Sequence, residues 1–144
     1  MGRFLKLNQS IIRTIKASAG FPSPAENYID EQLDLNKYLI KNMESTFFIR
    51  VSGDSMIDVG IFNDDIIIVD KGLTPMNKSI VIVSLNEELV IKRLLKDRMS
   101  KNYYLKSENS KYPNIKFSAD SDVKIWGVAT YVIHSLSYDC SSRL

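Results

Sequence analysis

Residues 80–95 read IVIVSLNEELVIKRLL, two runs of β-branched and apolar residues separated by Asn86 and Glu87. Each run has the length and composition of a strand, and asparagine tolerates the left-handed backbone conformation that a tight turn requires. The stretch therefore predicts a β-hairpin. Working outward from it, similar short runs between turn residues predict further strands and a mainly β fold; they lie at 47–51, 66–69, 103–106 and 123–133.

Composition limits the classes of function. The chain has 144 residues, 44% of them hydrophobic, which suits one compact domain. The formal net charge of +2 is too small to indicate a protein that coats nucleic acid. A single cysteine excludes an intramolecular disulfide and zinc sites of the Cys₂His₂ or Cys₄ kind, so we expect no metal, no cofactor and a reducing cytoplasm. We expect no membrane contact, because the apolar runs are only strand-sized.

The two ends of the chain differ from this β-rich centre. Residues 1–19 form a basic arm in which charged and amide side chains interrupt every apolar run, so a secretory signal is not expected despite the small residues at 17–19. Apolar spacing within 27–40 predicts one or two short helices. Residues 135–144 have the composition of a polar tail.

Residues 52–56, Ser-Gly-Asp-Ser-Met, directly follow the strand predicted at 47–51. Gly-Asp-Ser is ordinary turn chemistry, so a purely structural turn is one interpretation. The functional interpretation is that Ser55 is held on a sharp bend, with backbone N–H groups beside it that stabilise an oxyanion. These residues alone are compatible with both.

Lys92 lies in the second run of the hairpin, between apolar residues on each face of a strand. The alternation does not determine which face is buried, and an edge lysine whose stem covers apolar surface also fits. A serine hydroxyl is a poor nucleophile until a base removes its proton. His134, the single imidazole, borders the polar tail, and we interpret it as a surface or hydrogen-bonded residue. Lys92 is the other candidate base.

A lysine acts as a base only in its neutral form. Its ordinary pKa of about 10.4 leaves roughly one molecule in a thousand neutral near neutral pH, a deficit of about 4 kcal/mol. Burial among apolar side chains lowers a lysine pKa by up to about 5 pH units, which is enough to close that gap. Ser55 beside a desolvated Lys92 is therefore sufficient for nucleophilic chemistry.

Three features together resemble the LexA/UmuD family of self-cleaving peptidases: the Gly53–Met56 segment, the spacing from Ser55 to Lys92, and the upstream pair Ala19-Gly20. Within that family the UmuD branch, accessory subunits of error-prone DNA polymerase, is the most similar. The segments that carry this finer resemblance are GFPSPA at 20–25, LDLN at 33–36 and DDIIIVD at 64–70. The resemblance extends from about residue 19 to residue 133.

The resemblance implies a LexA-like fold of short, strongly bent strands with a flexible N-terminal arm. It implies that Ser55 is the nucleophile and Lys92 the general base. The backbone amides of Ser55 and Met56 would form the oxyanion site, and the cut bond would join Ala19 to Gly20. The chain would then consist of an arm at 1–19 that is removed, a peptidase domain at 20–134 and a tail at 135–144.

The resemblance also implies partners. Such proteins form homodimers, cut themselves when the RecA filament on single-stranded DNA stimulates them, and in shortened form join the catalytic subunit of an error-prone polymerase during the SOS response to DNA damage. Only 19 residues precede Gly20, too few for a helix-turn-helix module, so sequence-specific DNA binding is not expected.

Two alternatives use the same residues. The first is a non-enzymatic, polymerase-regulating binding module whose serine and lysine are present but poorly aligned. The second is a LexA or phage-type repressor peptidase without its DNA-binding domain.

Overall fold

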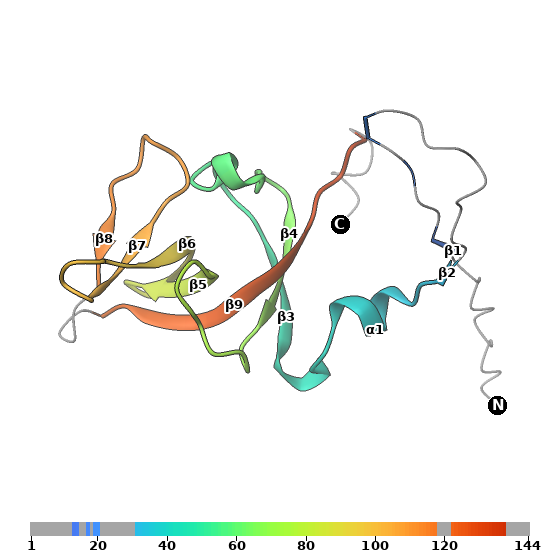
Figure 1. Ribbon diagram of the computed structural model, residues 1–144, viewed down its shortest axis with the longest axis horizontal. Coiled ribbons are helices and arrows are strands. Elements are labelled where there is room, and N and C mark those ends of the chain that lie inside the picture. The colour runs from blue at the N-terminus through green and yellow to red at the C-terminus, as the bar shows by residue number, and fades with distance from the viewer. Residues whose placement is uncertain (1–12, 15–16, 18, 21–30, 118–121, 138–144) are drawn as a thin grey trace. The chain divides into compact units, whose positions relative to one another are not determined.

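The computed structural model describes residues 13–14, 17, 19–20, 31–117 and 122–137 (Figure 1). The chain divides into two units, residues 1–40 and residues 41–144, which are considered separately. In the first unit, β1 (Arg13–Thr14) pairs antiparallel with β2 (Glu31–Gln32). The helix α1 (Leu35–Leu39) follows, and the Asp34 carboxylate caps it by accepting the amides of residues 36 and 37. The helix predicted within 27–40 is therefore one short helix, and residues 27–30 lie outside the described part.

The second unit contains a seven-stranded antiparallel sheet in the order β3-β4-β9-β5-β6-β7-β8. All the predicted strands are present, and the mainly β fold is confirmed. The short strand at 115–116 was not predicted. The strands are β3 (Thr46–Arg50), β4 (Ile66–Asp70), β5 (Ile80–Leu85), β6 (Glu88–Lys96), β7 (Tyr103–Lys106), β8 (Ile115–Lys116) and β9 (Lys124–Ile133), and the 3-10 helices are η2 (Met43–Ser45) and η3 (Ile57–Val59).

The long strand β9 lies between β4 and β5 and pairs with both, so it joins the strands β3 and β4 to the strands β5 to β8 (Figure 1). Its pairing register shifts once against each neighbour, and such irregularities bend a strand. At Gly127 the neighbouring strands approach closely: a Cβ built there would lie 2.6 Å from a side-chain carbon of Val69, which is fully buried. A side chain at position 127 would therefore collide with Val69 unless one of the two strands shifted.

Apolar side chains pack on both faces of strand β5, because successive residues of a strand point to opposite faces. Ile82 belongs to one cluster, with Val51 and Met56 from the segment that carries Ser55. Val81 and Val83 belong to a second cluster, with Leu94 and Leu105 from β6 and β7. The turn at 52–56 is thus attached to the core at both of its ends.

The hairpin predicted at 80–95 is present, with a two-residue turn. Leu85 pairs with Glu88, and Asn86 and Glu87 between them have φ values of 50° and 66°. Positive φ at both central residues is the signature of the type I′ turn, whose twist matches that of the flanking strands. Asparagine tolerates this conformation, whereas glutamate at the second position does so at a cost.

We expect Glu87→Gly to raise the free energy of unfolding by about 1 kcal/mol, because glycine adopts positive φ without the steric penalty of a Cβ. Urea unfolding of the full chain measures the change. Glu88→Gly, one residue later in strand β6, is the matched control and should lower stability, because glycine weakens a strand. Equal effects of the two variants would contradict this account of the turn.

No helix in the described ranges combines the length and the apolar character needed to cross a membrane.

Candidate active site

Ser55 lies on a tight turn between strand β3 and helix η3. Gly53 in this turn has a φ of 96°, and its backbone amide donates to the Asn63 side chain at 2.9 Å. Two backbone hydrogen bonds close the base of the turn: the Val51 amide donates to the Asp65 carbonyl, and the Val51 carbonyl accepts the Asp64 amide. Ser55 itself is half-buried, and within the described residues neither its amide nor that of Met56 donates a hydrogen bond. Both N–H groups are therefore unpaired among the described residues.

Lys92 lies in strand β6 opposite Val81 of β5, on the face occupied by the second apolar cluster. The structure thus decides which face of the strand is buried, and Lys92 is only 8% exposed. No carboxylate in the described part of the chain forms an ion pair with it. Burial accordingly lowers the pKa of the Lys92 ammonium below its ordinary value, because desolvation disfavours the charged form.

A cavity of about 290 Å³ brings Ser55 and Lys92 together. Residues 49–56, residues 89–92 and Tyr112 line it. Within the described residues the two side chains are not hydrogen-bonded to each other; the Lys92 ammonium instead donates to the Ser107 hydroxyl at 2.7 Å. Serine and lysine therefore share one partly apolar cavity, while a second serine holds the lysine.

One edge of strand β6 is open beside this cavity. Strand β7 pairs with β6 only over Arg93–Lys96, so residues 88–92 have no strand partner on that side among the described residues. An edge with unpaired backbone groups can take up an extended peptide by strand addition. The open edge and the cavity together offer a place for a polypeptide substrate.

Three side chains that the sequence did not single out also contribute to the site: Ser107, Asn109 and Tyr112. Ser107 contacts Lys92, and the other two donate to Asp54, next to Ser55. The Tyr112 ring centroid lies 5.8 Å from the Lys92 ammonium nitrogen. The phenol donates to the Asp54 carboxylate at 2.7 Å, and this bond and the adjacent negative charge raise the pKa of Tyr112.

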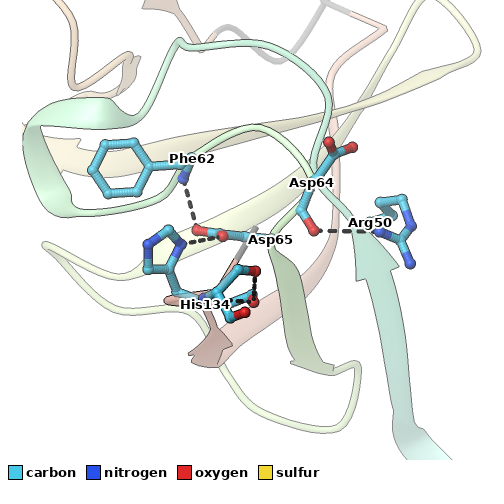
Figure 2. Close-up of polar contacts among 7 residues, drawn as sticks. Arg50, Phe62, Asp64, Asp65 and His134 are labelled. Atoms are coloured by element: carbon cyan, nitrogen blue, oxygen red, sulfur yellow. Dashed lines mark hydrogen bonds and ion pairs between the residues drawn. The ribbon is translucent and has the colours of Figure 1, made fainter. Parts of the chain in front are cut away.

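His134 lies outside the cavity, in agreement with its interpretation as a hydrogen-bonded residue. Figure 2 shows its ring beside the Asp65 side chain, with Nδ1 2.6 Å from a carboxylate oxygen. The other carboxylate oxygen of Asp65 accepts the Phe62 amide at 2.8 Å (Figure 2). Asp65 is 3% exposed, so this pair satisfies a buried carboxylate next to the base of the Ser55 turn.

Ala19 and Gly20 belong to the first unit, where both are exposed and lie in a bend. A Cβ built on Gly20 would meet no other atom within 4 Å. No group of three or more metal-ligating side chains is gathered among the described residues.

Comparison with known proteins gives consistent matches over most of the chain. Residues 10–130 match the family described as peptidase S24-like. The protein SamA of Salmonella typhimurium is 42% identical over 84% of this chain and 82% of its own length. The protein MucA of Escherichia coli is 38% identical over 81% of this chain and 78% of its own length. The LexA repressor of Caldicellulosiruptor saccharolyticus is 38% identical over 78% of this chain and 52% of its own length. The resemblance to the LexA/UmuD peptidases is confirmed.

Proposed function

This chain belongs to the peptidase S24-like family, and on that premise we propose that it is a self-cleaving serine peptidase that cuts its own Ala19–Gly20 bond. The observation that carries the proposal is the cavity that Ser55 shares with a buried Lys92. A nucleophile and a desolvated base in one cavity, next to two free backbone amides, is the arrangement that acyl transfer requires.

The first half of the reaction forms an acyl-enzyme. Neutral Lys92 accepts the proton of the Ser55 hydroxyl, and the serine oxygen attacks the carbonyl carbon of Ala19. The amides of Ser55 and Met56 stabilise the resulting oxyanion. When the intermediate collapses, the bond to the Gly20 nitrogen breaks and the Lys92 ammonium donates its proton to that leaving amine. Ala19 is then joined to Ser55 as an ester, and Gly20 carries a new amino terminus.

The second half returns the site to its starting state. Water replaces the amine, Lys92 takes one of its protons, and the hydroxide oxygen attacks the ester carbon. Collapse of this intermediate passes the proton from Lys92 to the Ser55 oxygen and releases Ala19 as a carboxylic acid, which loses its remaining proton to solvent. Asp54 also lines the cavity, where one of its carboxylate oxygens accepts the Tyr112 hydroxyl; we assign the proton transfer to the buried Lys92.

The biological role follows as part of the same proposal. The chain from Gly20 onward acts as a dimer, as the accessory subunit of an error-prone DNA polymerase, in the cytoplasm during the SOS response. The RecA filament on single-stranded DNA triggers the cut by binding the cleavable arrangement more tightly than the resting one. The support is the UmuD-like segment at 20–25 and the similarity to SamA and MucA over about four fifths of the chain.

One observation also favours the second candidate, a polymerase-regulating module without peptidase activity. Lys92 donates to Ser107 and not to Ser55, and a chain whose dyad never acts would have the same contact. The two candidates predict different fates for the full chain and are separated by the experiment that follows.

We expect the full chain, incubated without any activator, to release residues 1–19 at a rate that rises with pH and then levels off. The rate should rise because the fraction of neutral Lys92 rises with pH, and it should level off below the usual lysine range because burial lowers this pKa. Mass spectrometry of samples taken over a pH series measures both fragments. RecA filaments should accelerate the same cut at neutral pH. A chain that stays intact under both conditions would overturn the peptidase proposal.

Gly20→Val is the control for the position of the cut. The variant should fold, because a Cβ built at the exposed Gly20 meets nothing within 4 Å beyond its chain neighbours. It should nevertheless stay intact, because a branched side chain next to the cut bond obstructs the close approach of the backbone to the two reacting groups. Cleavage at the parent rate would mean that a different bond is cut.

A further inference from the structure

Residues 107–112, which we name the bridging loop, contact both halves of the proposed dyad. Ser107 follows strand β7 directly and its hydroxyl accepts the Lys92 ammonium at 2.7 Å. At the other end of the loop, the Tyr112 hydroxyl donates to the Asp54 carboxylate at 2.7 Å, one residue before Ser55. A single six-residue segment therefore touches the strand that carries the base and the turn that carries the nucleophile.

The middle of the bridging loop strengthens the connection to the turn. The Asn109 side-chain amide donates to the Asp54 backbone carbonyl at 2.8 Å, and the Glu108 carbonyl accepts the Asp58 amide at 2.9 Å. Asn109 is 6% exposed, so its contact with Asp54 is shielded from competing water, and Ser107, 3% exposed, is similarly shielded where it contacts Lys92. The Ser55 turn is thus held by the loop from both sides of Met56.

The loop is equally fixed to strand β6. Besides Ser107 on Lys92, the Glu108 carboxylate accepts Arg93 at 2.6 Å, and that arginine also donates to the Lys78 carbonyl at 2.7 Å. Lys106 lies 3.7 Å from the second Glu108 oxygen. Glu108 therefore forms ion pairs with Arg93 and Lys106, and not with Lys92.

Ser55 and Lys92 come from separate elements and make no hydrogen bond to each other in the described part of the chain. The bridging loop adds polar contacts between these elements to the apolar packing of Val51 and Met56 with Ile82. We propose that the bridging loop is the positioning element of the dyad, with Ser107 orienting the Lys92 amine and Tyr112, together with Asn109, orienting the Ser55 turn. This inference rests on the proposed peptidase function and assigns the alignment of Ser55 with Lys92 to a segment outside the dyad.

The hydrogen-bond pattern gives Ser107 a definite role. A neutral amine has two N–H bonds and one lone pair, and only the lone pair can take the Ser55 proton. When one N–H is fixed on the Ser107 oxygen, the rotation of the amine about its last carbon–nitrogen bond is restricted. A base oriented by a third group in this way is the general arrangement of activated serine nucleophiles.

The test compares two loop variants with matched controls, in the full chain, by self-cleavage rate over a pH series. Ser107→Ala should lower the plateau rate by about 10- to 100-fold, because small misplacements of reacting groups have effects of this size. Its midpoint should move to lower pH, because an acceptor that stabilised the ammonium has been removed. Tyr112→Phe, at an exposed position, should lower the plateau by about tenfold and leave the midpoint in place, because the ring over Lys92 is retained.

Ser84→Ala and Tyr103→Phe are the matched controls. Ser84 is a half-buried serine in strand β5 and Tyr103 an exposed tyrosine in strand β7, and neither lines the cavity. Both should cleave as the parent does. Parent-like pH profiles for both loop variants would overturn the proposal. A Ser107→Ala midpoint that moved to higher pH would also overturn it, because entry of water beside Lys92 would then explain the lower cleavage rate. The peptidase proposal fails separately, if a Ser55→Ala chain is still cut.

Discussion

Lys92→Arg should abolish release of residues 1–19 at every accessible pH. A guanidinium keeps its proton to a pH above about 12, so burial that neutralises a lysine leaves an arginine charged and unable to act as a base. General-base catalysis contributes about 10²–10⁴ in rate, and loss of this size takes a slow self-cleavage below detection. Mass spectrometry of the variant after long alkaline incubation measures the result.

Lys96→Arg is the control for this substitution. Lys96 lies in the same strand and is exposed, and its ammonium nitrogen lies 5.6 Å from the Tyr103 ring centroid. An arginine at this position can make the same cation–π contact. This variant should be cut as fast as the parent. A Lys92→Arg chain cut at the parent rate would show that another group removes the serine proton, because no property of arginine replaces a neutral amine.

Much of the fold follows from local patterns in the sequence. The hairpin at 80–95 is specified by two apolar runs and by Asn86, which has the predicted left-handed conformation; Glu87 has a positive φ as well, which was not predicted. Strand β9 also follows from composition, but its bend does not. Its register shifts between 129 and 131 against β4 and between 125 and 127 against β5, and Gly127 lies close to the buried Val69, a contact between residues far apart in sequence. Local periodicity contains no information about such a contact.

The burial of Lys92 is a second feature that periodicity does not determine. Val90 and Leu94 lie on one face of β6 and Ile91 on the other, so both faces of the strand are apolar in sequence. The structure shows that both faces of the neighbouring β5 are covered by core clusters, and Lys92 lies on the face of Val81. Its low exposure is therefore a property of the assembled sheet.

Ser107 was missed for a related reason. It follows strand β7, whose Lys106 pairs with Arg93, so continuing the antiparallel register places Ser107 opposite Lys92. That register depends on how residues 97–102 form the connection between β6 and β7, and the sequence alone does not fix it. A polar segment such as 107–112 otherwise resembles any surface loop, although its buried Asn109 and Ser107 are unlike surface residues. The strand pairing is the signal that would have found Ser107.

Ser55→Ala should fold as the parent does and release no detectable residues 1–19, even at high pH or with RecA filaments. The side chain is half-buried, and its hydroxyl makes no hydrogen bond within the described residues, so removing it leaves no partner unsatisfied. The acyl-enzyme cannot form without the attacking oxygen. Without that attack no oxyanion arises for the two backbone amides to stabilise. Thermal unfolding of the samples measures whether the variant folds as the parent does, and mass spectrometry measures whether residues 1–19 are released.

A mixing experiment extends the same variant. The Ser55→Ala chain has an intact bond and no nucleophile, whereas the Gly20→Val chain has a nucleophile and an obstructed bond. If one chain docks its arm in the cavity of another, mixing the two should release residues 1–19 from the Ser55→Ala chain alone, and the rate should depend on concentration. If the cut occurs only within a chain, both variants should stay intact in the mixture. Cleavage of the Ser55→Ala chain by itself would remove Ser55 from the mechanism, because no second chain with the hydroxyl is then present to supply the attack.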